Sequence, residues 1–179
     1  MASDKLSIRE KVGYSLGDTA SHFVWDMVNF WLIFYYSDVL KIGIGWAATI
    51  AIIGTIMDAV MDPIVGMWAD RTHTRWGKFR PYLLFGCVPF ALCAFLAFYG
   101  PDFGSAWEWN VTADKALNAN VLYVLVTFVM LRVIYAIVNI PYSSLGAVMS
   151  NDPLERAGLN SYRFVAANVG QLLISGLAL

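Results

Sequence analysis

Five long apolar stretches constrain this 179-residue sequence more than any other feature. They cover approximately residues 18–39, 45–68, 82–99, 121–149 and 162–179. A bilayer core about 30 Å thick requires about 20 apolar residues of helix, and the strands of membrane barrels are much shorter. Only 14% of the residues are charged, against about 25% in soluble domains. The sequence therefore predicts an all-α membrane protein with five spans.

Basic residues near the spans indicate the orientation of the chain. They cluster before the first span, after the second and around the start of the fifth: Lys5, Arg9, Lys11, Arg71, Arg75, Lys78, Arg80, Arg156 and Arg163. The opposite connectors contain only Lys41 and Lys115. The N-terminus is polar and no cleavable signal follows it. We therefore predict a multi-pass protein of the bacterial inner membrane with a cytoplasmic N-terminus.

The connector from Gly100 to Asn120 is predicted to be an outer loop. Aromatic residues in and beside this loop are expected to anchor it at the outer membrane interface. They are Tyr99, Trp107, Trp109 and Tyr123. The net charge of −1 gives no indication of nucleic-acid binding.

Two acidic residues lie inside the second span, where ionisable groups are costly and need a reason. Asp58 and Asp62 are four positions apart and share one helix face, with Thr55 on the same side. Two carboxylates this close repel when both are charged, and they relieve the repulsion by holding a cation or sharing a proton. We predict a cation site here, with Asp58 and Asp62 as metal ligands only if the ion is sodium. The alternative is a carboxylate pair neutralised by a basic neighbour.

Polar residues also form stripes on the first and fourth spans. The first stripe contains His22, Asp26 and Asn29, flanked by Trp25, with Asp18 near the membrane interface. The second stripe lies on the fourth span, where its residues are three, four and four positions apart: Arg132, Tyr135, Asn139 and Ser143. Such stripes are expected to face a bundle interior or a water-filled cavity.

Arg132 lies midway along its apolar run and needs a partner there. It is expected to pair with Asp26, Asp58 or Asp62, or to contact an anionic ligand. Asn139, Tyr135 and Trp25 suit sugar recognition, because an amide bonds hydroxyls and an aromatic face covers a pyranose ring. Three polar stripes around one cavity fit a secondary transporter. They do not predict an enzyme, because the sequence shows no nucleophile–base set, metal-ligand spacing or phosphate loop.

Five short motifs together resemble the glycoside–pentoside–hexuronide cation symporters, a branch of the major facilitator superfamily. They are Val12–Asp18, Tyr35–Val39, Asp58–Pro63, Arg75–Pro81 and Asn139–Tyr142. The resemblance covers essentially the whole chain. It implies twelve helices in two six-helix halves, of which this chain supplies helices one to five, so that the missing C-terminal half is an expected partner.

The resemblance also implies roles for particular residues. It implies coupling to sodium, a proton or lithium at Asp58 and Asp62, with no cofactor. It implies sugar binding by His22, Asp26, Tyr135, Asn139 and Arg163. It further implies that the basic connector acts as a cytoplasmic latch, formed by Asp70, Arg71, Arg75, Gly77, Lys78 and Arg80.

Departures from the family's melibiose-transporting members bear on substrate and ion. Acids stand in those members where this chain has His22 and Asn139, which argues against melibiose. An Asn and a Thr stand there in place of Met61 and Ala136. A thioether and a methyl group are poor sodium ligands, which favours proton coupling. The chain looks more like the xyloside and glucuronide members.

The sequence thus predicts a cation-coupled symporter for a glycoside or pentoside, embedded in the lipid bilayer. A hexuronide bound through Arg132 is an alternative substrate. A non-transporting fragment or half-module with a structural role is an alternative function, since five helices do not make a two-half transporter.

Overall fold

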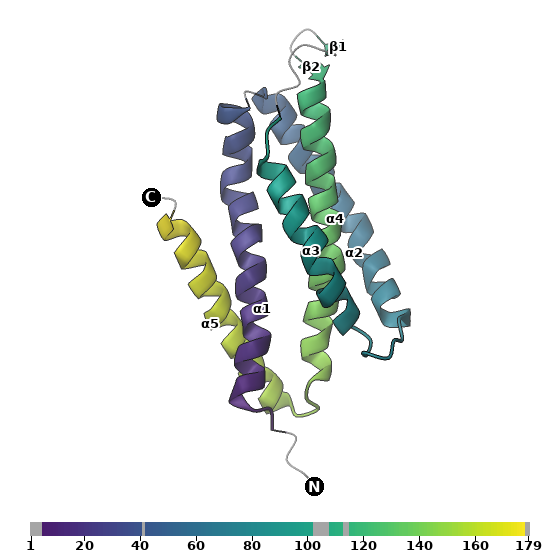
Figure 1. The fold of residues 1–179 in the computed structure, drawn as a ribbon, viewed down its shortest axis with the longest axis vertical. Coiled ribbons are helices and arrows are strands. Elements are labelled where there is room, and N and C mark those ends of the chain that lie inside the picture. The colour runs from purple at the N-terminus through teal and green to yellow at the C-terminus, as the bar shows by residue number, and fades with distance from the viewer. Residues whose placement is uncertain (1–4, 41, 102–107, 113–114, 178–179) are drawn as a thin grey trace. The chain divides into compact units, whose positions relative to one another are not determined.

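The computed structural model describes residues 5–40, 42–101, 108–112 and 115–177. Within them the chain is mainly helical (Figure 1). The elements in chain order are α1 (Ile8–Met27), the π-helical turns η1 (Val28–Leu32) and η2 (Tyr35–Val39), α2 (Ile44–Arg71), α3 (Arg80–Phe98), β1 (Glu108–Thr112), β2 (Lys115–Asn118), α4 (Ala119–Val148) and α5 (Pro153–Leu177).

The helices begin where capping and proline chemistry place them. Ser7 and Glu10 form a capping box at the start of α1, in which each side chain accepts a hydrogen bond from the other residue's backbone amide. Pro81 stands in the first turn of α3, where its missing N–H has no intrahelical role. Asp152 accepts a hydrogen bond from the Leu154 amide at the start of α5.

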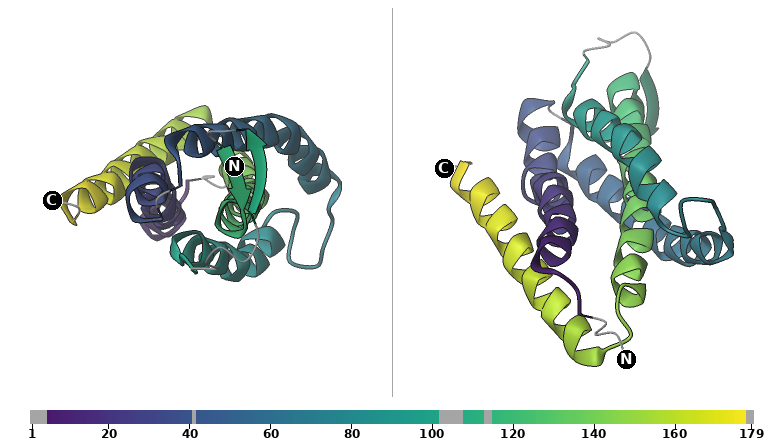
Figure 2. Two further views of the ribbon diagram at one scale, coloured as in Figure 1. Left: turned by 90° about the horizontal axis from the view of Figure 1, so that it is seen from above. Right: turned by 60° about the horizontal axis from the view of Figure 1, so that its bottom comes forward.

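The chain divides into two compact units, Met1–Trp31 with Tyr142–Leu179, and Leu32–Pro141. In the first unit α1 and α5 pack side by side (Figures 1 and 2). Lys11 pairs with Glu155 at 2.7 Å, and further along both helices the Thr19 hydroxyl donates to the Ala166 carbonyl at 3.0 Å. Because partner positions increase together, the two helices run in the same direction.

In the second unit α4 contacts both α2 and α3. The close approach of α3 uses Gly86, where an added Cβ would lie 2.5 Å from a Val138 methyl carbon. The Tyr123 hydroxyl donates to the Leu96 carbonyl at 2.8 Å. The opposite face of α3 exposes large apolar side chains at helical spacing: Leu84, Val88, Leu92 and Phe95. That pattern fits lipid as the solvent.

Three helices in the described part of the chain are long and apolar enough to cross a membrane, namely α2, α3 and α4. The predicted span 45–68 lies within α2, 82–99 reaches one residue beyond α3, and 121–149 reaches one residue beyond α4. The predicted span 162–179 lies in α5 as far as Leu177. The predicted span 18–39 begins ten residues into α1 and continues through the two π-helical turns.

The predicted loop from Gly100 to Asn120 includes two short strands that the sequence analysis did not predict. It contains the antiparallel hairpin of β1 and β2, with Trp109 opposite Leu117. The local alternation of residues there is too short to be recognised beside the long apolar runs. Of the predicted interfacial aromatics, Trp107 and the side chain of Trp109 lie outside the described residues, as do Lys41 and the side chain of Lys115.

Candidate functional site

The two acidic residues of the predicted cation site differ in their surroundings. Asp58 is half-buried and Asp62 is exposed. Thr55, one turn before Asp58, is exposed and its hydroxyl donates to the Ala51 carbonyl of its own helix at 3.1 Å. Of the three residues predicted to share this helix face, only Asp58 is thus partly buried, whereas Thr55 and Asp62 are exposed.

Arg132 of α4 forms an ion pair with Asp58 through Nη1 and Oδ2. The side chains of Arg132 and Asp58 are 14% and 28% exposed, so the pair is largely sheltered within its unit. The Arg132 guanidinium also lies 5.1 Å from the centre of the Phe128 ring, within the range of a cation–π contact. Of the three acids that we expected as partners of Arg132, the structure selects Asp58.

Gly54 makes room for this arrangement one turn before Asp58. A Cβ at Gly54 would lie 2.5 Å from Cε1 of Phe128 and 3.3 Å from Nε of Arg132. Only a residue without a side chain lets α2 approach α4 this closely. Gly54 was not singled out by the sequence analysis, because a single glycine in an apolar run carries no distinct signal.

Two predicted sugar ligands lie further along α4. Tyr135 is half-buried and its ring lies 5.9 Å from the ring of Phe90 on α3, in a tilted arrangement. Asn139 is also half-buried, one turn after Tyr135. Arg132, Tyr135 and Asn139 therefore share a partly sheltered stripe of α4.

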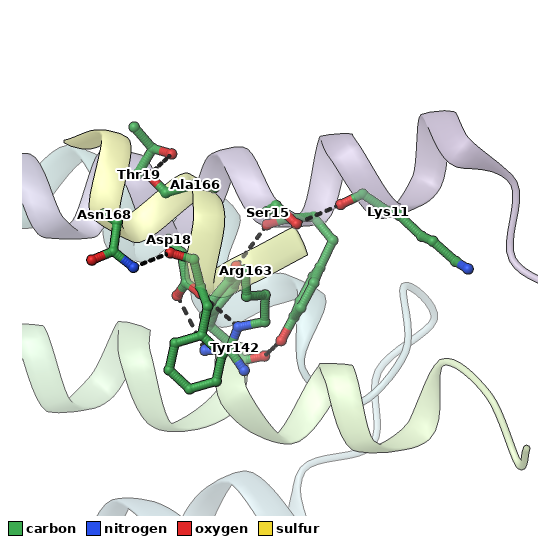
Figure 3. A network of polar contacts seen from close by, with 10 residues as sticks. Lys11, Ser15, Asp18, Thr19, Tyr142, Arg163, Ala166 and Asn168 are labelled. Carbon is green, nitrogen blue, oxygen red and sulfur yellow. Dashed lines mark hydrogen bonds and ion pairs between the residues drawn. The ribbon is translucent and has the colours of Figure 1, made fainter. Parts of the chain in front are cut away.

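In the other unit, Arg163 of α5 is bound by Asp18 of α1 (Figure 3). Nε donates to Oδ2 at 2.6 Å and Nη2 donates to Oδ1 at 3.1 Å, which is the bidentate geometry that guanidinium and carboxylate favour. Asp18 is 7% exposed. The sequence analysis treated Asp18 as an ordinary interfacial residue and Arg163 as a sugar ligand, and it did not pair them.

Two tyrosines enclose the Asp18–Arg163 pair. The Arg163 guanidinium lies 5.5 Å from the Tyr14 ring centre and 5.2 Å from the Tyr142 ring centre. The two rings stack at 4.6 Å, and each hydroxyl donates to the other residue's backbone carbonyl. Tyr14 and Tyr142 lie in two of the motifs that resemble the symporter family, Val12–Asp18 and Asn139–Tyr142. Nothing in the spacing of these motifs indicated that the two rings are in contact.

The remaining predicted residues of α1 interact locally. His22 Nδ1 lies 3.3 Å from Oδ2 of the buried Asp26. Trp25 is half-buried. Asn29 is exposed in the π-helical turn η1, where its amide donates to the Trp25 carbonyl at 2.7 Å. Because α1 and the stripe of α4 belong to different units, their meeting around one cavity stays a prediction.

The predicted latch connects α2 and α3 (Figure 2). Gly77 has a backbone φ of +98°, in the region that favours glycine. The turn closes on a hydrogen bond of 2.6 Å from the Thr74 hydroxyl to the Gly77 carbonyl. Lys78 pairs with Asp70 at 2.9 Å. The other basic members, Arg71, Arg75 and Arg80, are exposed.

The sequence matches a known protein family over most of its length. Residues 13–179 match the model of a family described as MFS/sugar transport protein. The chain belongs to this family. As a member of the MFS/sugar transport family, it has the all-α membrane fold.

Relatives in this family are named as symporters, carriers and transporters, and not as enzymes. The inner membrane symporter YicJ of Escherichia coli K12 is 41% identical over 173 residues, which are 97% of this chain and 35% of the relative. The glucuronide carrier protein homolog of the same organism is 38% identical, with coverages of 93% and 34%. The isoprimeverose transporter of Lactiplantibacillus pentosus is 34% identical, with coverages of 95% and 33%. The chain spans about a third of the length of these relatives.

Proposed function

We propose that this sequence forms the front part of a secondary active transporter, which carries a glycoside or pentoside across the bacterial inner membrane together with a proton or sodium ion. The observation that carries the proposal is the presence of two acidic residues, Asp58 and Asp62, inside α2. This helix is apolar and long enough to cross a membrane. Ionisable residues within membrane spans mark ion and substrate pathways, and two neighbouring carboxylates relieve their repulsion by holding a cation or a proton.

The family and the names of the relatives support the substrate class. One relative is named a glucuronide carrier homolog and another an isoprimeverose transporter. We favour a neutral glycoside over a hexuronide, because Arg132 is engaged by Asp58. A guanidinium that already binds a carboxylate must give up that partner to bind a second anion.

The remaining parts of the proposal concern geometry and assembly. The sugar would contact His22, Trp25, Asp26, Asn29, Tyr135, Asn139 and, if it is released from Asp18, Arg163. The N-terminus and the latch would face the cytoplasm, where their basic residues favour them. Alternating access would need the second half of the transporter, which the relatives' greater length suggests.

The test is sugar-dependent alkalinisation of the medium by cells that produce the full-length protein, with and without sodium. Uptake of sugar with a proton should raise the external pH, and Asp58→Asn or Asp62→Asn should abolish coupled accumulation. Serine replacement of the exposed Cys87 provides a control that should leave uptake unchanged. Normal accumulation in both Asn variants would contradict the proposal. So would a full-length wild-type protein that is produced in the membrane but transports no sugar.

A further inference from the structure

Arg132, Asp58 and Asp62 are three charged residues of the second unit, and the two acids differ in their contact with the arginine. Arg132 is the one charged residue in the sequence of α4, and within the described residues it is ion-paired with Asp58 rather than with Asp62. The Phe128 ring and the space at Gly54 hold the guanidinium beside Asp58. Asp62, one turn further along α2, is exposed.

The three charges sum to −1 when both carboxylates are ionised. One monovalent cation at Asp62 would therefore neutralise the set completely. Without Arg132 the two carboxylates alone would carry −2, and they would both be open to a metal ion. Arg132 thus changes both the charge of the site and the number of oxygen ligands that it offers.

We propose that Arg132 determines ion specificity: by occupying Asp58 it leaves Asp62 as the one open carboxylate of the pair, so that the site accepts a proton in preference to sodium. This inference rests on the proposed function, and it goes further by assigning the choice of ion to a residue of α4 outside the quoted motifs.

Sodium is disfavoured by the ligands that remain. A hard metal ion requires several oxygen ligands at once. Met61, next to Asp62, offers only a thioether. The guanidinium repels a second cation and must be displaced before Asp58 can contribute an oxygen. A proton needs only one oxygen, which the exposed Asp62 carboxylate supplies.

The experiment measures sodium binding by the purified full-length protein, together with sodium stimulation of sugar uptake. Wild type is expected to show neither. Arg132→Gln, and Arg132→Met as a second variant of similar volume, should gain sodium binding and at least about fivefold stimulation of uptake, the lower end of ordinary coupling between sites. Arg132→Lys keeps the charge and should behave like wild type.

Two further variants separate the roles of the acids. Asp58→Asn with Arg132→Gln removes one carboxylate together with its guanidinium partner, so this double variant should not gain sodium binding. Asp62→Asn should lose coupling whether or not Arg132 is present. Sodium binding by wild type at the level of Arg132→Gln would overturn the inference, as would an Arg132→Gln variant that binds no more sodium than wild type. Sodium binding is read without sugar, so a failure of transport itself would count against the proposed function alone.

Discussion

Tyr14 and Tyr142 each donate a hydroxyl hydrogen bond to the other residue's backbone carbonyl, at 2.8 Å and 2.6 Å, while their rings stack. This reciprocal contact joins α1 to the last turns of α4 across 128 positions of sequence. Two glycines make it possible. A Cβ at Gly17 would lie 2.7 Å from the Tyr142 ring, and one at Gly146 would lie 2.5 Å from the Tyr14 hydroxyl oxygen.

Gly17→Ala should therefore destabilise the protein. The Tyr142 ring is fixed by its hydrogen bond and by stacking, so it cannot move away from a new methyl group without losing them. We expect a loss of about 1–3 kcal/mol, as for other overpacked interiors. The measurement is the thermal unfolding midpoint of the full-length protein in detergent.

Gly13→Ala is the matched control for this substitution. Gly13 lies on the same helix, is exposed, and has no atom within 4 Å of an added Cβ. Alanine is a better helix former than glycine by about 1 kcal/mol, so the midpoint should stay unchanged or rise. Equal losses in Gly13→Ala and Gly17→Ala would show that the tyrosine contact is not the cause.

Asp18→Asn should lower stability as well, because it leaves the Arg163 guanidinium sheltered without its carboxylate. The Arg163 side chain is 23% exposed, so we expect about 1–3 kcal/mol, between the values for surface and fully buried pairs. Arg163→Lys should cost less but still lose the bidentate geometry. Glu155→Gln, in the ion pair of Glu155 with Lys11, is the control and should have the smaller effect, because this pair lacks the bidentate geometry.

The same variants test the role of Arg163 in transport. If Arg163 mainly holds Asp18, then Arg163→Lys and Asp18→Asn should lower the unfolding midpoint together. If instead Arg163 binds the sugar directly, Arg163→Lys should raise the KM for uptake while the midpoint stays at the wild-type value. That second result would contradict the structural role inferred from the ion pair.

Gly54→Ala should disturb the pairing of Arg132 with Asp58. The new methyl group would meet the Phe128 ring at 2.5 Å and push it toward the guanidinium. We expect a loss of about 1–3 kcal/mol in stability, together with reduced coupled uptake. Gly66→Ala is the control on the same helix, since an added Cβ there has no neighbour within 4 Å. Uptake that falls equally in both variants would remove the support for a specific role of Gly54.

The sequence was sufficient to predict the helices but not their pairing. Apolar runs of about 20 residues leave few alternatives to transmembrane helices, and the Asp58 and Asp62 spacing places both acids on one face of α2. The contact of Asp18 with Arg163 joins residues 145 positions apart. It depends on α1 and α5 running in the same direction, which no local pattern records. A polar stripe indicates that a helix face is sheltered, but several acids can satisfy one arginine, as the three candidates for Arg132 illustrate.

The π-helical turns and the hairpin were missed for a related reason. The turns η1 and η2 lie inside a continuous apolar run, where hydropathy is the same for an α-helix and a π-helix. The strands β1 and β2 are five and four residues long. Such short elements carry too few positions for alternation to be distinguished from loop composition.

The capping box at the start of α1 should make that helix end sensitive to acid. The Ser7 backbone amide, and then the Ser7 hydroxyl, hold the pKa of the Glu10 carboxylate below its ordinary value of 4.5. A lowered pKa in the folded state means that the carboxylate contributes stability above pH 4.5 and loses it as the pH falls through the lowered value. Hydrogen exchange of the first-turn amides, corrected for intrinsic rates, should therefore speed up only as the pH falls below 4.5. Glu10→Gln keeps an acceptor oxygen without a titrating group, so its protection should be independent of pH, whereas Ser7→Ala should expose the turn at every pH. An identical acid response in wild type and Glu10→Gln would show that another group controls this end of α1.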